Sequence, residues 1–233
     1  MSATSSPPRT AAERGRCSAR VALLAGATGL IGRALLPMLN ASASYALTHV
    51  LVRRAPSGAA ADARSSFHVV DFTQLPALPA ISDCYITLGT TIKVAGTQAA
   101  FREVDFDFVV NTARAARAAG ATRLAVVSAL GADVNSTVFY NRVKGEMQAA
   151  VGALGFDSVV IAQPSLLLGD RAAIGQPTRT AEVWAARLLA PAMWLVPRTV
   201  RPIAAAKVAA ALLATTLEAQ PGVRLLSSSQ MQG

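Results

Sequence analysis

Short apolar runs recur along the chain, separated by longer segments with helical spacing. The runs lie at residues 20–25, 48–52, 67–70, 84–88, 123–127 and 158–162, and runs this short predict strands that are buried on both faces. The segments between them predict helices over residues 31–40, 98–119, and from 135 or 136 to about 154. Strands that alternate with helices imply crossover connections and a parallel sheet. We therefore predict an α/β fold, a three-layer doubly wound parallel sheet of the Rossmann type.

The helix over residues 98–119 has the clearest pattern. Its predicted buried face follows from spacings of three and four between Phe101, Val104, Phe108, Thr112, Ala115 and Ala119. Gly120 stands where a C-terminal cap would end the helix.

The pattern changes after Pro164. Residues 169–180 form a polar stretch with Gly and Pro that predicts a loop, and residues 184–190 and 204–217 predict helices. These segments are too short for a second domain. We therefore expect one Rossmann domain over residues 20–233, in which residues 165–233 contribute a small helical cap over the substrate pocket. Residues 1–19 are expected to form a disordered basic tail.

Composition narrows the class of protein. Hydrophobic residues make up 52% of the 233 residues and charged residues 15%, which provides for a full core and excludes a disordered chain. The longest uncharged run, residues 34–52, is interrupted by Pro37, Asn40 and His49, so no membrane-spanning helix is expected. Two cysteines and two histidines argue against a disulfide scaffold, a metal site and a His-based triad. The expected location is a reducing cytoplasm.

The chain is basic, with a net charge of +9. Residues 1–20 hold four arginines and one glutamate, and the remaining charge is spread without a block of five or more basic residues. This distribution favours a solvated basic surface over nucleic-acid binding. The Arg-rich, acid-poor start also has the composition of a transit peptide, although a disordered leader is the favoured interpretation.

A glycine-rich turn follows the first predicted strand and opens the first predicted helix. Its spacing, Gly26-x-x-Gly29-x-x-Gly32, stands where dinucleotide-binding proteins hold a pyrophosphate against a helix N-terminus. A plain strand-to-helix turn is the alternative. The residues expected to hold the cofactor here are Gly26, Thr28, Gly29, Leu30, Ile31 and Gly32.

The end of the second predicted strand favours NADP over NAD. An NAD site usually places a carboxylate there, but this chain has none from Arg14 to Ala61 and carries Arg53 and Arg54 instead. A guanidinium pairs well with a 2′-phosphate; the alternative is two surface arginines. Asp71 and Phe72 follow the third predicted strand, where an adenine commonly rests, although Asp71 serves equally well as a strand-end cap.

Three residues suggest proton-transfer chemistry. Tyr140 and Lys144 lie one turn apart on a predicted helix, so the ammonium is expected to lower the pKa of the phenol. Tyr140 then exchanges a proton with a substrate oxygen, and Lys144 also reaches the nicotinamide ribose. Ser128 ends the fifth predicted strand at the ligand-binding edge of such sheets, where its hydroxyl can polarise the same carbonyl. An ordinary helical pair and a turn serine are the alternatives.

These residues resemble the short-chain dehydrogenase/reductase superfamily. Further motifs resemble its atypical subgroup around the Tat-interacting oxidoreductase-like proteins, which are related to NmrA-like and epimerase-like proteins. They are Leu88-Gly-Thr-Thr91, Val104-Asp-Phe-Asp107, Ser128-Ala-Leu-Gly-Ala-Asp133, Phe139-Tyr-Asn-Arg-Val-Lys-Gly-Glu146 and Pro164-Ser-Leu-Leu-Leu-Gly-Asp-Arg171. The likeness covers about residues 21–213.

The resemblance implies an NADP(H)-dependent oxidoreductase with a triad of Ser128, Tyr140 and Lys144 and the glycine motif described above. It also implies cofactor contacts from Leu88, Gly89 and Thr90, and from Pro164, Ser165 and Leu166 near the nicotinamide. Members often carry Arg before that proline, whereas this chain has Gln163, which predicts a looser contact near the pocket.

Three functions remain open. The favoured one is hydride transfer on a small carbonyl or alcohol substrate, with Tyr140 as the acid/base. The second is a nucleotide-sensing regulatory protein without turnover, and the third is a nucleotide-sugar epimerase or dehydratase. The resemblance implies a homodimer face on the helix that begins near Gln98 and on the helix that carries Tyr140; the alternative is that these helices only cover the sheet.

Overall fold

The fold is described here from a computed structural model, which describes residues 20–55, 63–168, 197 and 199–232. Seven strands form one parallel sheet in the order β3-β2-β1-β4-β5-β6-β9. Their bounds are β1 Arg20–Ala25, β2 Tyr45–Val52, β3 Ser65–Val69, β4 Asp83–Ile86, β5 Arg123–Val127, β6 Ser158–Gln163 and β9 Gly222–Ser227. Two short strands, β7 Leu167–Leu168 and β8 Ile203–Ala204, pair separately. The predicted doubly wound parallel sheet is confirmed.

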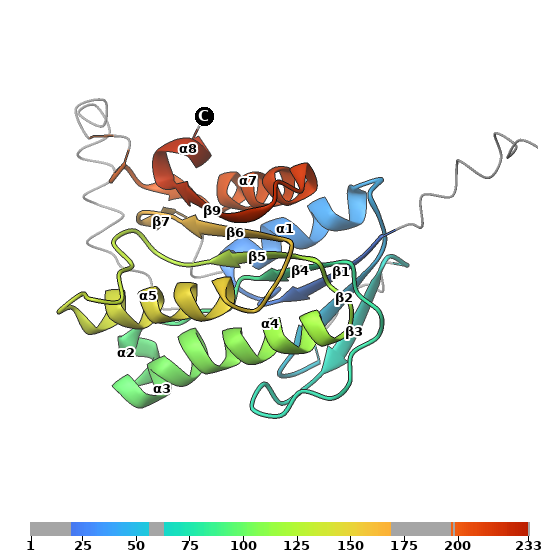
Figure 1. Ribbon diagram of the computed structural model, residues 1–233, viewed down its shortest axis with the longest axis horizontal. Helices are drawn as coiled ribbons and strands as arrows, with labels where there is room; N and C mark the ends of the chain where they lie inside the picture. The colour runs from blue at the N-terminus through green and yellow to red at the C-terminus, as the bar shows by residue number, and fades with distance from the viewer. Residues whose placement is uncertain (1–19, 56–62, 169–196, 198, 233) are drawn as a thin grey trace, which may run out of the picture.

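Helices cover both faces of the sheet (Figure 1). The longer ones are α1 Leu30–Ala41, α4 Phe108–Ala118, α5 Phe139–Gly152 and α7 Ala205–Glu218, and the shorter ones are α2 Ile92–Ala95, α3 Gln98–Arg102 and α8 Ser228–Gln232. α1 and α7 pack together on one face, and α4 and α5 lie on the other. Neighbouring residues of one strand face opposite layers, as Leu23 and Leu24 do. Because both faces are covered, the strands read as continuous apolar runs.

The described part of the C-terminal region continues the sheet and one helix layer, and the cap over the substrate pocket stays a prediction. α7 belongs to the layer that contains α1, and β9 extends the main sheet beside β6. β9 is an edge strand in which Val223 and Leu225 are exposed and Leu226 is buried, so its sequence lacks the apolar run of an inner strand. The expected tail 1–19, the expected loop 169–180 and the expected helix 184–190 lie outside the described residues.

The predicted helix over residues 98–119 is interrupted by one π-helical turn, Glu103–Asp107, between α3 and α4. The wider turn changes which residues face inward: Asp105 is buried, and Val104 is only half-buried. Val104, which the helical spacing grouped with Phe101, is therefore less buried than Phe101. Gly120 follows the end of α4 with a φ of +98°, as predicted for a C-terminal cap.

α5 begins at Phe139, later than the sequence predicted. Asn135 and Ser136 do not cap it, because they belong to the preceding turn: the Asn135 amide donates to the Asp133 carboxylate at 2.9 Å, and the Ser136 hydroxyl accepts from the Val138 amide at 3.2 Å. The connection β5–α5 is therefore a compact turn that delivers Tyr140 within the first turn of the helix.

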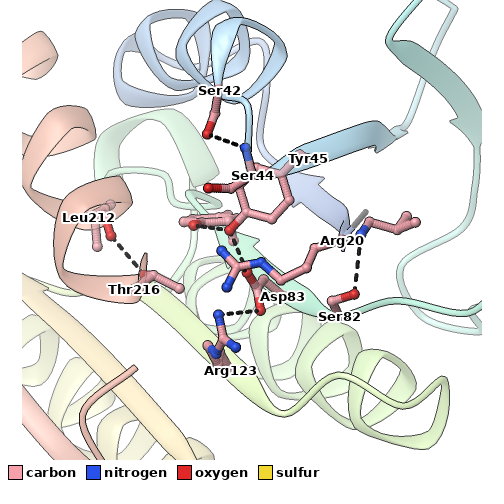
Figure 2. A network of polar contacts seen from close by, with 11 residues as sticks. Arg20, Ser42, Ser44, Tyr45, Ser82, Asp83, Arg123, Leu212 and Thr216 are labelled. Atoms are coloured by element: carbon pink, nitrogen blue, oxygen red, sulfur yellow. Dashed lines mark hydrogen bonds and ion pairs between the residues drawn. The ribbon is translucent and has the colours of Figure 1, made fainter. Parts of the chain in front are cut away.

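A buried polar cluster lies at the amino-terminal edge of the sheet (Figure 2). Asp83 accepts a hydrogen bond from the Tyr45 hydroxyl at 2.5 Å and lies 3.3 Å from the Arg20 guanidinium and 3.6 Å from that of Arg123. Tyr85 joins through its hydroxyl, 2.8 Å from that of Tyr45. Four of these residues, Arg20, Tyr45, Asp83 and Arg123, are the first residues of β1, β2, β4 and β5. The cluster therefore connects four strands at the edge of the sheet opposite the carboxyl-terminal ends of the strands.

Candidate active site

A cavity of about 520 Å³ opens at the carboxyl-terminal edge of the sheet. Its lining comes from the segments that follow β1, β4, β5 and β6, from α5 and from the π-helical turn Glu103–Asp107. β1 and β4 are neighbours from which the chain runs outward in opposite directions, and open α/β sheets bind ligands at such a switch point. Twelve residues expected at the site line this cavity: Gly29, Leu30, Ile31, Leu88, Gly89, Thr90, Ser128, Tyr140, Lys144, Pro164, Ser165 and Leu166.

Two glycines of the turn after β1 are required by the fold itself. Gly26 has a φ of +95°, and a Cβ there would lie 2.6 Å from the carbonyl carbon of Thr87. A Cβ on Gly32 would lie 2.1 Å from the carbonyl oxygen of Gly26. The Thr87 hydroxyl, which the sequence did not single out, donates to the carbonyls of Ala25 and Gly26 at 3.1 Å each. These contacts fix the turn against β4.

Gly29 differs from the other two glycines, because the nearest atom to a Cβ there would be 3.5 Å away. It is the N-cap residue of α1 and makes no side-chain capping bond, and the first turn of α1 contains no acidic residue. The first amides of the helix therefore keep their donors for an anion. The open space at Gly29 fits the close approach of a pyrophosphate, so this turn fits a dinucleotide. Thr28 is exposed on the same turn and does not line the cavity.

Arg53 and Arg54 are exposed immediately after β2. β2 pairs with β1, with Leu51 opposite Ala25, so the two arginines follow a strand beside the glycine turn. They do not line the described cavity. Their place fits a group that extends from the cavity past the glycine turn, as the adenosine half of a dinucleotide does.

Asp71 and Phe72 follow β3, where the sequence predicted a contact with the adenine of a cofactor. The Asp71 carboxylate accepts from the Thr73 amide at 2.8 Å, and this bond lowers the pKa of Asp71. Its strand-end capping role is thus present in the structure. Phe72 is buried and stacks on Phe108 with ring centroids 5.7 Å apart. Its side chain therefore packs in the core, and the contact of Phe72 with a cofactor stays a prediction.

Ser128 is buried at the end of β5, and its hydroxyl is held from behind. Gln148 on α5 donates from its amide nitrogen to the Ser128 oxygen at 2.6 Å, and Gln163 on β6 donates to the Gln148 amide oxygen at 3.3 Å. Because Ser128 accepts from Gln148, its own proton stays available to donate into the cavity. Sequence reasoning missed Gln148. Gln163, noted there as a departure, is the far end of this chain of hydrogen bonds.

Tyr140 stands near the start of α5, with the ring of Phe101 5.3 Å away between centroids. Burial raises the pKa of Tyr140, Lys144 lowers it and Asp105 raises it, and the net direction is upward from the ordinary value of 10.0. The sequence predicted a lowered pKa from Lys144 alone. That prediction was wrong for the net effect, because the desolvation of the phenol and the charge of Asp105 outweigh the ammonium.

Asp105 is the main residue that sequence reasoning missed. Its carboxylate lies 2.7 Å from the Lys144 ammonium, and both side chains are at most 4% exposed. Its second oxygen accepts from the Thr90 amide at 2.8 Å. Asp105 is part of the motif Val104-Asp-Phe-Asp107, which the sequence analysis quoted. Regular α-helical spacing, however, placed Val104 on the inward face in place of Asp105.

The chain matches a family of proteins described as NAD(P)H-binding over residues 26–173. The chain belongs to this NAD(P)H-binding family. It is 36% identical over 151 residues to "Protein FMP52, mitochondrial" of Eremothecium gossypii, which covers 64% of this chain and 67% of that protein. The family assignment agrees with the glycine turn and the switch-point cavity.

Solved structures of low sequence identity share the fold. The Bordetella bronchiseptica enzyme WbmG in complex with NAD has a TM-score of 0.64 and 17% identity, covering 91% of this chain and 74% of that one. A UDP-N-acetylglucosamine 4-epimerase from Methanobrevibacter ruminantium M1, in complex with UDP-N-acetylmuramic acid, has a TM-score of 0.66 and 11% identity, covering 89% and 76%. The chain thus shares the Rossmann-type α/β fold of these two proteins.

The comparisons correct the expected location. Curated relatives between 31% and 38% identical carry mitochondrial names, which contradicts the cytoplasmic location inferred from cysteine usage. Two cysteines do not distinguish reducing compartments from one another, so that inference had little physical basis. Among the helices that the structure describes, none combines the length and hydropathy that crossing a bilayer requires.

Proposed function

We propose that this protein is an NADP(H)-dependent oxidoreductase that interconverts a small carbonyl compound and its alcohol. One observation carries the proposal: Gly29 of the glycine turn lines the same switch-point cavity as Ser128, Tyr140 and Lys144. The family binds NAD(P)H, and a sheet edge that holds a dinucleotide beside a proton donor provides both parts of a carbonyl reduction.

The chain's own residues would handle the proton and the carbonyl oxygen. A bound nicotinamide supplies the hydride to the carbonyl carbon in reduction and accepts it in oxidation. In reduction, Ser128 donates a hydrogen bond to the carbonyl oxygen and Tyr140 transfers its hydroxyl proton to that oxygen, which gives the alcohol. Solvent returns the proton to Tyr140. Lys144 supplies positive charge beside the phenol.

The first experiment compares NADPH and NADH binding by calorimetry. We expect tighter NADPH binding, because Arg53 and Arg54 offer guanidinium groups for the 2′-phosphate. Arg53→Gln and Arg54→Gln should remove the preference, whereas Arg114→Gln, at an exposed arginine on α4, should leave it unchanged. Equal affinity of the wild type for both nucleotides would overturn the proposed preference while keeping the family.

The second experiment tests turnover. Purified protein with NADPH is offered a panel of aldehydes, ketones and UDP-glucose, with Tyr140→Phe as the control that keeps the ring beside Phe101. Loss of at least about 100-fold in kcat for Tyr140→Phe is expected of a general acid. Tight NADPH binding without turnover of the panel would favour the sensing protein, and conversion of the sugar nucleotide would favour the epimerase.

We also infer a mitochondrial location from the names of the curated relatives. The basic start of the chain, with four arginines and one glutamate in residues 1–20, has a composition compatible with import. Microscopy of the full chain fused at its C-terminus to a fluorescent protein tests this. A diffuse signal that does not coincide with a mitochondrial marker would contradict it.

A further inference from the structure

The Asp105–Lys144 ion pair is almost completely buried. The two side chains are 1% and 4% exposed, and Nζ of Lys144 lies 2.7 Å from Oδ1 of Asp105. Burying two charges costs more solvation energy than a surface pair does, and such pairs often add little net stability. The pair lies at the wall of the candidate site, where Asp105 and Lys144 both line the cavity. Its position therefore points to the chemistry of that site.

The local backbone is shaped around Asp105. The π-helical turn Glu103–Asp107 turns this residue inward, and single π turns inside helices are frequent at functional sites. Oδ2 is anchored by the Thr90 amide at 2.8 Å. Gly89 keeps space beside the pair, since a Cβ there would lie 3.3 Å from Oδ1 of Asp105 and 3.8 Å from Nζ of Lys144. The loop after β4 and the π-helical turn thus meet at this carboxylate.

Asp105 also changes the electrostatics of Tyr140. The charged groups that act on the phenol are Lys144 on α5, which favours tyrosinate, and Asp105 on the π turn, which disfavours it. From α3, Phe101 presents an uncharged ring. With its counter-charge in contact, the ammonium cannot act on the phenol as an isolated cation would.

We propose that Asp105 is a positioning residue that holds the Lys144 ammonium at the site and opposes the loss of the Tyr140 proton before substrate binds, an inference that rests on the proposed oxidoreductase function. A protonated Tyr140 is the form that gives a proton to a carbonyl oxygen. The resting site is therefore set for carbonyl reduction, and alcohol oxidation begins only after Tyr140 loses its proton.

The test uses tyrosinate absorbance in the full chain without nucleotide or substrate. The chain has three tyrosines, and burial raises the pKa of both Tyr45 and Tyr85 far above its ordinary value. Subtracting the titration of Tyr140→Phe isolates Tyr140. Asp105→Asn keeps an acceptor for the Thr90 amide but removes the charge, and should lower the Tyr140 midpoint by about one pH unit or more. Asp107→Asn, an exposed position on the same turn, should leave it unchanged.

A second readout is the pH profile of kcat/KM for alcohol oxidation, whose rise with pH should move down by the same amount in Asp105→Asn. A Tyr140 midpoint in folded Asp105→Asn that equals the wild-type value would overturn the proposal. If Asp105→Asn does not fold, Lys144→Gln is compared with the double variant Asp105→Asn/Lys144→Gln. The double variant should show the lower Tyr140 titration midpoint of the two. Equal midpoints in these two variants would also overturn the proposal. Because the absorbance titration needs no turnover, a wild type inactive on every substrate would reject the proposed function without deciding the role of Asp105.

Discussion

Gln148 on α5 donates its amide hydrogen to the Ser128 hydroxyl oxygen at 2.6 Å, across the gap between the helix layer and the end of β5. The direction of this bond matters, because a hydroxyl that already accepts one hydrogen bond turns its own proton toward another acceptor. Gln163 fixes the Gln148 amide in that orientation from β6. Contacts between three elements thus leave the Ser128 hydroxyl proton free to donate to an acceptor other than Gln148.

We predict that Gln148→Leu lowers kcat/KM about 3- to 10-fold, which corresponds to one hydrogen bond of roughly 0.5–1.5 kcal/mol. The loss should come without a change in NADPH affinity, because the Gln148 side chain does not line the cavity. Gln74→Leu, at an exposed position, is the matched control. Steady-state kinetics and calorimetry measure both quantities, and an unchanged kcat/KM in a folded variant would contradict the role of Gln148.

The glycine turn gives a prediction that separates folding from binding. Gly32→Ala should destabilise the protein strongly, because its Cβ would lie 2.1 Å from a backbone oxygen. Gly29→Ala should fold normally, because its Cβ meets nothing closer than 3.5 Å, yet weaken NADPH binding at least about 10-fold by blocking the approach of the phosphates. Gly152→Ala, with 3.6 Å to its nearest neighbour, is the control. Thermal unfolding and calorimetry together test the pair, and full NADPH affinity in Gly29→Ala would refute it.

Much of this architecture follows from local sequence. The run Arg20–Ala25 was predicted to the residue, because a strand buried on both faces needs unbroken apolar side chains and the glycine turn marks its end. The glycine turn could also be predicted from the sequence. The φ of +95° at Gly26 and the crowding at Gly32 require glycine at these two positions, so the motif carries the signal.

The rest depended on contacts between distant residues. Val104 matched the helical spacing, and only the π turn placed Asp105 inward instead. β9 lacked a signal because an edge strand buries few of its side chains: Val223 and Leu225 stay exposed. Gln148 is an ordinary polar helix residue until β5 brings Ser128 opposite it. The net direction of the Tyr140 pKa likewise required burial and Asp105, neither of which spacing reveals.

The cluster at the other edge of the sheet should contribute to stability and not to catalysis. We predict that Asp83→Asn lowers the free energy of unfolding by about 3 kcal/mol, because Arg20 and Arg123 lose the carboxylate that both approach within 3.6 Å. Asp71→Asn, at an exposed carboxylate, should cost far less. Urea unfolding measures both variants. A stability loss in Asp83→Asn no larger than that in Asp71→Asn would show that the cluster is not needed for the fold.

The two histidines predict a dependence of stability on pH. Nδ1 of His49 on β2 lies 2.9 Å from Nε2 of His68 on β3, so one ring donates to the other while both are neutral. Burial and the neighbouring His68 lower the pKa of His49 from its ordinary value of 6.5. Between its folded pKa and 6.5, the unfolded chain binds more protons at this position than the folded one does, so stability should fall as the pH decreases through that range and level off below it.

His49→Gln should therefore flatten this part of the stability curve, because the variant lacks the group with the lowered pKa. His68→Gln should flatten it in part, since it removes the second cause of the lowered pKa and leaves burial. Urea unfolding at a series of pH values between about 5 and 8, the interval in which histidine titrates, measures all three proteins. If the wild type and His49→Gln lose stability in parallel on acidification, the pair does not control this pH dependence and the slope arises elsewhere.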